Sequence, residues 1–258
     1  MPKMRENRIL AFVRFFVGGL LPGGYTTGVK GWLLKFFGDL VSFTAQNFQG
    51  ILPLWKKEPA FSSAFQKYKS RIDMDERRAH VLYSFARSCV GVPGKYAEVG
   101  SYRGGSAMLV SLASENNKEL FLFDTFEGFP ETTPDQDLDV WKKGEMSDVN
   151  IDDVKAFLVD RRVRFFQGVF PETAQGIDET EAFAFVHLDT DLYESTLEGC
   201  RFFYSRMSPS SILLVDDYGM VLFPGVRSAV KIFESEIPEI GTYLPTGQYM
   251  FIKKGSVE

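Results

Sequence analysis

From residue 95 onward, short apolar runs alternate with helical patterns, and this alternation is the feature that most constrains the fold. Each run is a near-continuous apolar stretch, as in strands that are buried on both faces of a parallel sheet. The runs span residues 95–99, 119–124, 163–168, 182–189 and 210–217. The helical patterns span residues 105–115, 150–160, 193–207 and 226–237, and Asn150 is the predicted N-cap of the second. We therefore predict an α/β fold with a mostly parallel sheet that helices cover on both faces.

Both ends of the chain depart from this alternation. Residues 242–246 and 248–254 read as a final pair of strands, which predicts a C-terminal antiparallel hairpin. Residues 1–73 are rich in aromatic residues and interrupted by loops such as LPGGYTTG, and we interpret them as an N-terminal helical cap or extension. Residues 74–258 then form the main domain, which opens on a helical pattern that stops at GVPG.

The apolar segment from Ile9 to Leu21 follows a basic start and superficially resembles a signal peptide. Arg14 interrupts it, and no small-residue cleavage pattern follows. The segment is also shorter than the about 20 apolar residues that a membrane-spanning helix needs. We interpret it as an amphipathic helix that packs on its own domain or on a partner subunit, with a membrane-surface or lid role as the alternative.

Charge and composition narrow the classes of ligand. The net charge of -5 argues against binding to nucleic acid or to an anionic membrane, and it suits small neutral or cationic ligands. The chain has two cysteines and two histidines, so a zinc site or a Cys-His nucleophile would have few residues to draw on. We interpret Cys89 and Cys200 as buried thiols of a cytoplasmic protein, because neither has metal-ligand spacing. Any metal should therefore be a hard cation with oxygen ligands.

Carboxylates stand at the ends of four of the five apolar runs. In parallel sheets, ligands bind outside the carboxyl ends of the strands, near the point where the strand order switches. In chain order, the runs end in Glu98, in Asp124, in Gln167, in Asp189 with Asp191, and in Asp216 with Asp217.

The first of these acids belong to a predicted cofactor site. Glu98, Gly100 and Gly104 have the order E-x-G-x-x-x-G, which lacks the spacing of a dinucleotide-binding loop and argues against a nicotinamide oxidoreductase. An acid beside this loop would repel a pyrophosphate but suits an ammonium group, and Asp124 can accept hydrogen bonds from a ribose. An ammonium and a ribose without phosphate indicate S-adenosylmethionine, although either acid alone could be a helix-capping or surface group. The residues predicted to bind this cofactor are Glu98, Gly100, Ser101, Tyr102, Gly104, Ser106, Asp124, Phe126, Gln167 and Asp189.

The remaining acids indicate a metal. Asp189, Asp216 and Asp217 end two strands that should be neighbours, and three converging carboxylates repel one another unless a cation or a proton relieves them. Mg²⁺ fits, since it prefers oxygen ligands and keeps waters that a substrate can displace.

Four motifs together resemble the macrocin O-methyltransferase family, a class I methyltransferase family that modifies sugar hydroxyls of natural products. They are YAEVGSYRGGSAML, LFDTFEGFPE, FVHLDTDLYESTLEG and ILLVDDYG followed by PGVRSAV, and the resemblance runs from about Met74 to Lys253. It implies a Rossmann-like fold with a mostly parallel seven-stranded sheet, an N-terminal cap that shapes the acceptor site, and a homo-oligomer. It also implies that Asp189, Asp216 and Asp217 bind Mg²⁺ and that Asp191 is the general base.

Three alternatives stay open. His187 could serve as the base, but it precedes Asp189 by two residues and so lies one step deeper on the same strand face, where it would orient a metal ligand. The acceptor could be a catechol-type diol in place of a sugar or glycoside. The polar loop from Thr125 to Val149, with Phe129 and Trp141, could close over the cofactor or be a static surface loop.

Overall fold

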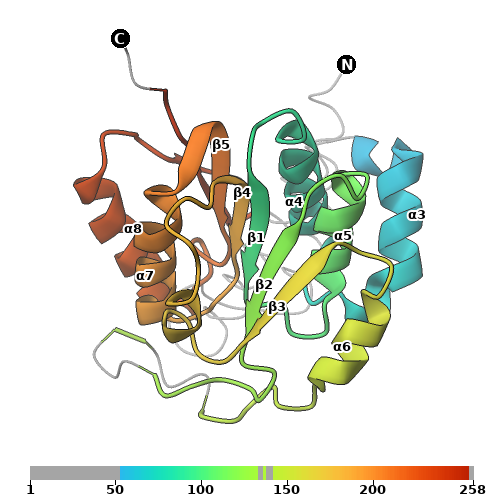
Figure 1. Cartoon of the computed structure of the whole chain (residues 1–258), viewed down its shortest axis with the longest axis horizontal. Coiled ribbons are helices and arrows are strands. Elements are labelled where there is room, and N and C mark those ends of the chain that lie inside the picture. Colours follow the sequence, from blue (N-terminus) through green and yellow to red (C-terminus); the bar gives the residue numbers. More distant parts are fainter. Residues whose placement is uncertain (1–52, 133–135, 138–141, 256–258) are drawn as a thin grey trace, which may run out of the picture. The chain divides into compact units, whose positions relative to one another are not determined.

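The computed structural model describes residues 53–132, 136–137 and 142–255 (Figure 1). The chain divides into two compact units, Met1–Leu54 and Trp55–Glu258, and the second contains the whole sheet. Residues 55–73, which the sequence assigns to the N-terminal cap, lie in this second unit. The predicted helix at Ile9–Leu21 lies outside the described residues.

A seven-stranded sheet forms the centre of the second unit. Its strands are β1 (Lys95–Val99), β2 (Leu120–Asp124), β3 (Val163–Gln167), β4 (Phe183–Leu188), β5 (Met207–Val215), β6 (Thr242–Tyr243) and β7 (Tyr249–Ile252). They lie in the order β3-β2-β1-β4-β5-β7-β6, with β1 to β5 parallel and β7 antiparallel to both β5 and β6. The predicted parallel sheet and C-terminal hairpin are thus confirmed. The strand order switches between β1 and β4, where a ligand is expected in such sheets.

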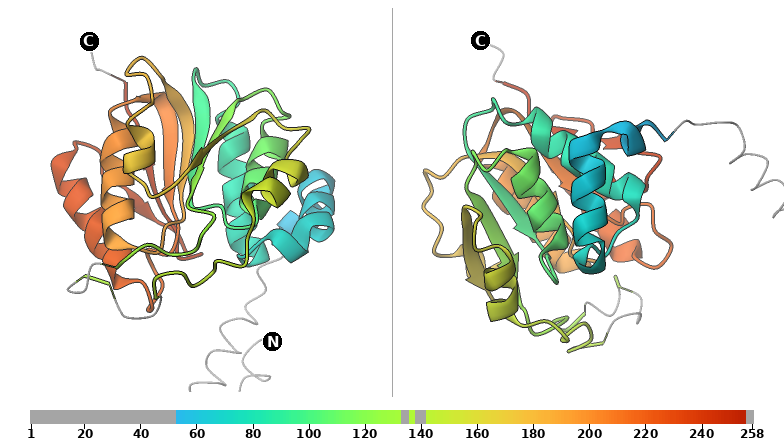
Figure 2. Two further views of the ribbon diagram at one scale, coloured as in Figure 1. Left: turned by 60° about the horizontal axis from the view of Figure 1, so that its bottom comes forward. Right: turned by 90° about the vertical axis from the view of Figure 1, so that its right-hand side faces the viewer.

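Helices cover both faces of the sheet (Figure 2). One face carries α3 (Pro59–Tyr68), α4 (Glu76–Ser88), α5 (Gly105–Ala113) and α6 (Ile151–Phe157), and the other carries α7 (Tyr193–Tyr204) and α8 (Pro224–Glu236). Short 3₁₀ turns occur at Leu54–Lys57, Lys69–Arg71 and Glu172–Ala174.

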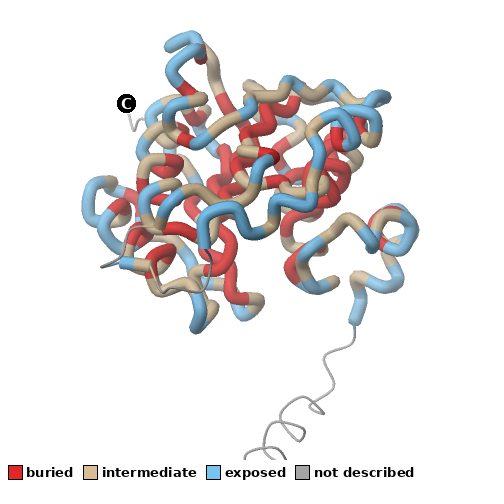
Figure 3. Tube along the Cα trace, turned by 90° about the horizontal axis from the view of Figure 1, so that it is seen from below, coloured by how far each residue is buried: buried red, intermediate tan, exposed pale blue. Residues whose placement is uncertain are grey.

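A hydrophobic core lies on each face of the sheet. The strands contribute side chains to both cores because alternate residues point to opposite faces. Leu120 and Leu122 pack with the helices α3 to α5, whereas Phe121 and Phe123 pack with α7 and α8. All four side chains are at most 1% exposed, which explains why the strands read as continuous apolar runs. Figure 3 shows the buried segments gathered in the interior of the described fold and the exposed segments on its outside.

Helix caps follow the sequence signals closely. Asn150, the predicted N-cap of α6, accepts a hydrogen bond from the Asp152 amide at 2.8 Å. The Asp75 carboxylate caps α4 by accepting from the amides of Arg77 and Arg78 at 2.8 and 3.3 Å. This cap places Arg78 in the first turn of α4.

From Met74 onward, the predicted helices and strands are all present, with shifts of a few residues. β5 begins at Met207 and not at residue 210, and α7 correspondingly ends at Tyr204. Cys89 and Cys200 are free and buried, as predicted. Within the part of the chain that the structure describes, no helix is both long and apolar enough to cross a membrane.

Candidate active site

The loop between β1 and α5 packs directly against the end of β4. Gly100 has a φ of +82°, and a Cβ at this position would lie 1.9 Å from the carbonyl oxygen of Asp189. The Asp189 amide in turn donates to the Val99 carbonyl at 2.9 Å. Only glycine permits this approach, and it brings the predicted cofactor loop next to the first acid of the D-x-D motif.

Asp124, at the end of β2, holds two loops together through its carboxylate. Its Oδ2 accepts from the amides of Ser101 and Tyr102 at 2.7 and 2.8 Å, and its Oδ1 accepts from the amide of Phe126 at 2.7 Å. Ser101 Oγ also donates to Oδ2, at 3.4 Å, whereas Oδ1 has a single donor among the described residues, so acceptor capacity for a ligand hydroxyl remains on Oδ1. Asp124 therefore both shapes the loop and faces the space beside it.

That space is a cavity of about 260 Å³ at the carboxyl ends of the strands. Most of the predicted site residues line it, namely Gly100, Ser101, Tyr102, Ser106, Asp124, Asp189, Asp191 and Asp217. Arg71, Met74, Arg78, Phe129, Met146 and Phe223 also line it. One cavity thus joins the predicted cofactor loop to the predicted metal ligands.

Other residues of the predicted set lie outside the lining. Glu98, His187 and Asp216 are buried beneath the cavity and are at most 1% exposed. Gly104 is the N-cap of α5, and Phe126 packs in the core below the helices. Gln167 is exposed at the end of β3, and the neighbouring Gly168 lines the cavity in its place.

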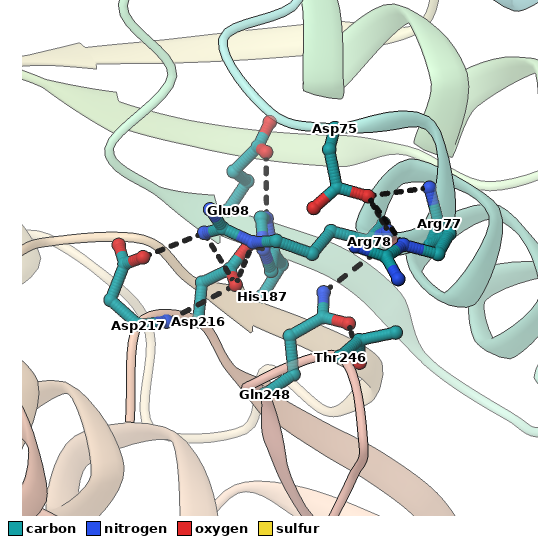
Figure 4. Close-up of polar contacts among 9 residues, drawn as sticks. All are labelled: Asp75, Arg77, Arg78, Glu98, His187, Asp216, Asp217, Thr246 and Gln248. Atoms are coloured by element: carbon teal, nitrogen blue, oxygen red, sulfur yellow. Dashed lines mark hydrogen bonds and ion pairs between the residues drawn. The ribbon is translucent and has the colours of Figure 1, made fainter. Parts of the chain in front are cut away.

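Glu98, His187 and Asp216 form a buried row across β1, β4 and the end of β5 (Figure 4). His187 Nδ1 lies 2.8 Å from Glu98 Oε1, and His187 Nε2 lies 3.5 Å from Asp216 Oδ2. Burial favours the neutral imidazole, but the contacts with Asp216 and Glu98 outweigh it and raise the pKa of His187 to about 10. Both ring nitrogens face carboxylates, so His187 orients Asp216 from below the cavity.

The acids at the ends of β4 and β5 form two overlapping groups that could hold a cation. His187, Asp189 and Asp216 make up one, and Asp189, Asp191 and Asp217 the other, with the potential ligand atoms of each group within 4.8 Å of one another. Asp191 and Asp217 have φ values of +59° and +58°, so both turns are held in left-handed conformations that aim these side chains inward. Asp189 belongs to both groups and is the central acid of the cluster.

Burial and mutual repulsion shift the pKa values of these acids. Burial, followed by the charges of Asp216 and Asp217, raises the pKa of Asp189 well above its ordinary value. Burial, with a hydrogen bond to Asp217, does the same for Asp191. For Asp216, burial acts in the same direction, but His187 and Arg78 overcome it and hold the pKa below its ordinary value. The cluster carries more acid than its own cations neutralise.

Arg78 is a site residue that the sequence analysis missed. Its Nε donates to Asp216 Oδ1 at 2.9 Å and its Nη2 to Asp217 Oδ1 at 2.7 Å. One signal was available, because Arg78 lies four residues before Leu82 and eight before Ala86, in the buried stripe of α4. An arginine in an apolar stripe needs a buried acidic partner.

The residues present fit a divalent cation. The free oxygens belong to carboxylates, which Mg²⁺ prefers. Asp216 Oδ2 is buried and has no hydrogen-bond partner among the described residues, although its neighbour Oδ1 is bonded to Arg78. His187 Nε2 forms an ion pair with this oxygen at 3.5 Å, which is longer than an ordinary hydrogen bond, so a metal ion would supply the close contact that the oxygen lacks.

The polar loop from Thr125 to Val149 is described in part. Thr125, Gly128, Phe129, Pro130 and Met146 line the cavity. Asp137 Oδ1 accepts from the Tyr193 amide at 2.9 Å, which ties the loop to the start of α7. Trp141 lies outside the described residues, and closure of the loop stays a prediction.

Solved structures share this fold. The O-methyltransferase NovP superimposes with a TM-score of 0.61 at 21% identity, over 72% of this chain and 83% of that one. The mostly parallel seven-stranded sheet and the position of the cavity at the carboxyl ends of its strands agree with the prediction from the sequence. The fold is that of the class I methyltransferases.

Sequence comparison then gives the family. The chain belongs to the macrocin-O-methyltransferase (TylF) family, whose profile matches residues 75–240. A tetracenomycin-C rhamnosyl 4'-O-methyltransferase of Streptomyces olivaceus is 31% identical over 144 residues, covering 50% of this chain and 55% of the relative. Mycinamicin III 3''-O-methyltransferase of Micromonospora griseorubida is 28% identical over 156 residues, covering 54% and 60%. The chain therefore spans little more than half the length of these relatives.

Proposed function

We propose that the protein is a Mg²⁺-dependent O-methyltransferase that transfers a methyl group from S-adenosylmethionine to a hydroxyl of a sugar or glycosylated natural product. One observation carries the proposal. A single cavity joins a glycine loop anchored by Asp124 to a cluster of four aspartates. Family membership and the relative that methylates a rhamnosyl-tetracenomycin C support the sugar class of acceptor.

The cofactor would lie on the β1–α5 loop. Gly100, Ser101, Tyr102 and Ser106 line one wall of the cavity, and the close packing of Gly100 on the Asp189 carbonyl fixes the position of the loop. Asp124 would accept hydrogen bonds from the ribose hydroxyls with its remaining lone pairs. Bound S-adenosylmethionine supplies an electrophilic methyl group, and the loop fixes the direction from which a hydroxyl can reach it.

Asp189, Asp216 and Asp217 would hold Mg²⁺. When bound, Mg²⁺ supplies positive charge that lowers the pKa of a nearby hydroxyl and orients it. His187 and Glu98 lie behind Asp216 and fix the direction of its carboxylate, which is a positioning role.

Asp191 would act as the general base and accept the hydroxyl proton at a carboxylate oxygen. It lines the cavity, and its side chain shares a hydrogen bond with Asp217, one of the proposed metal ligands. Burial and Asp217 raise its pKa, which makes it a stronger base than an ordinary carboxylate once it is ionised. His187, the alternative base, is buried and contacts carboxylates at both ring nitrogens.

The test is methyl transfer measured by mass spectrometry, with S-adenosylmethionine and parallel panels of glycosides and catechols. We expect transfer to a glycoside, loss of activity with EDTA, and recovery on addition of Mg²⁺. Transfer to catechols alone would replace the sugar assignment with the catechol-type alternative. Activity that is indifferent to EDTA would remove the metal from the proposal.

We further propose a cytoplasmic homo-oligomer, in line with the family resemblance and with the two free cysteines. Sedimentation of the full chain tests the oligomeric state, and a monomer at micromolar concentration would contradict it.

A further inference from the structure

Arg78 crosses from α4 to the acidic pair at the end of β5, 138 and 139 residues away in sequence. Its side chain is 11% exposed, and those of Asp216 and Asp217 are 0% and 6% exposed. Figure 4 shows its guanidinium directed at both carboxylates. Gln248 Nε2 donates to the Arg78 carbonyl at 3.4 Å, so the loop before β7 supports the backbone from which the side chain projects.

Arg78 contributes a fixed positive charge to the cluster. Guanidinium groups stay protonated in proteins, so this charge persists whether the neighbouring carboxyl groups are ionised or protonated. Asp216, Asp189 and Asp217 all interact with it electrostatically. A divalent cation at the same acids would therefore meet a positive charge that is already in place.

The two cations would use different oxygens. Arg78 donates hydrogen bonds to Oδ1 of Asp216 and to Oδ1 of Asp217. Asp216 Oδ2 stays without a hydrogen-bond partner among the described residues. Asp217 and Asp189 line the cavity, whereas Asp216 lies beneath it with its Oδ2 3.5 Å from His187 Nε2.

We infer that Arg78 is a built-in counter-ion that stabilises the acidic pair when the metal is absent and weakens the affinity of the site for the metal when it binds. This inference rests on the proposed metal site. Arg78 is a positioning residue, since it acts through Asp216 and Asp217. The physical reason is that arginine and metal neutralise the same carboxylates while repelling each other.

The test compares two substitutions that separate charge from contact. Arg78→Gln removes the charge but keeps an N–H donor, whereas Arg78→Lys keeps the charge but loses the forked geometry. Mn²⁺ binding to the full chain is measured by electron paramagnetic resonance, and thermal unfolding is followed with and without Mn²⁺ or Mg²⁺. Arg77→Met is the matched control, because Arg77 is the preceding residue on α4 and its side chain is 64% exposed.

We expect Arg78→Gln to bind Mn²⁺ at least about tenfold more tightly, because a buried unit charge a few ångström away is removed. Its midpoint of unfolding should fall without metal and rise more on metal addition than that of the wild type, because tighter binding gives a larger stabilisation. Arg78→Lys should keep an affinity within about threefold of the wild type, which is under 1 kcal/mol. Arg77→Met should change neither quantity.

The outcomes separate this inference from the proposed function. If the wild type binds Mn²⁺ and Arg78→Gln binds it no more tightly, the inference fails and the metal site stands. If only Arg78→Gln binds Mn²⁺, the inference holds and the Mg²⁺ dependence of the wild type is wrong. If neither binds, both are wrong. If Arg78→Gln does not fold even with metal, the Mn²⁺ affinity of Arg78→Lys tests the inference. Tenfold tighter Mn²⁺ binding by Arg78→Lys than by the wild type would overturn it.

Discussion

Glu98 on β1 and His187 on β4 are paired in register, and His187 Nδ1 lies 2.8 Å from Glu98 Oε1 with both side chains fully buried. The position of Glu98 bears on its predicted role as the ligand of the cofactor ammonium, because it lies beneath the cavity and not in its wall. Among the described residues, Glu98 contacts His187, and the opposite ring nitrogen of His187 contacts Asp216.

Glu98→Gln should therefore lower stability more than cofactor affinity. The substitution removes a charge-assisted hydrogen bond from a buried histidine, which should cost about 2–3 kcal/mol. Urea unfolding measures the stability, and calorimetry with S-adenosylhomocysteine measures the affinity, which should stay within about threefold of the wild type. A large loss of affinity in a protein of unchanged stability would restore Glu98 as a direct ligand.

Gly100→Ala should disrupt the cofactor loop. The new Cβ would lie 1.9 Å from the Asp189 carbonyl oxygen, at a φ of +82° that alanine disfavours, so the loop must move. We expect a loss of stability of about 2 kcal/mol or more and loss of measurable binding to S-adenosylhomocysteine. Gly91→Ala is the matched control, because a Cβ there meets nothing within 4 Å. Equal behaviour of the two variants would refute the close approach.

Asp124→Asn should weaken cofactor binding by about tenfold or more. The carboxylate accepts three backbone amide hydrogen bonds from two loops, and an asparagine can replace only one of its two oxygens as an acceptor. Calorimetry with S-adenosylhomocysteine gives the affinity. Asp178→Asn is the control, since Asp178 also accepts from a backbone amide but is exposed and outside the cavity lining. Unchanged affinity in Asp124→Asn would exclude a role in binding.

Asp191→Asn should abolish methyl transfer while leaving cofactor affinity intact. The amide has nearly the same shape as the carboxylate but cannot accept the hydroxyl proton, so we expect the rate to fall by at least about a hundredfold. Asp160→Asn serves as control, because Asp160 is exposed next to the amino end of β3. Substantial activity in Asp191→Asn would remove Asp191 as the base and turn attention to the other acids of the cavity.

Glu58→Gln should destabilise the protein at neutral pH but not in acid. Burial opposes ionisation of Glu58, yet hydrogen bonds from His80, at 3.0 Å, and from Arg87 hold its pKa below the ordinary value. A lowered pKa in the folded state means that the stabilisation is full above the unfolded-state pKa and is lost as the pH falls through the folded-state pKa. The difference, no more than about 1 kcal/mol, should shrink and then vanish as the pH is lowered below the ordinary glutamate pKa of 4.5 in urea titrations. Glu179→Gln, at an exposed site, should show no such pH dependence.

Sequence alone determined the order of the elements and the acids at their ends. Runs such as 119–124 predict buried strands because both faces of a parallel strand are apolar, and Asn150 marks the start of α6 through its capping side chain. The D-x-D of Asp189 and Asp191 and the pair Asp216–Asp217 follow their strands directly, so a common edge was predictable. These features are local or follow from parallel pairing, and periodicity is enough to see them.

Tertiary structure decided which groups face one another. Glu98 and His187 share a face only because β1 and β4 pair in one particular register, and a shift by one residue would have turned Glu98 toward the other core. Arg78 joins Asp216 and Asp217 because α4 packs over that same face, a contact between segments well over a hundred residues apart. Periodicity places a residue on a face of its own helix or strand, but the partner on that face is set by how the elements pack, and packing depends on the whole core.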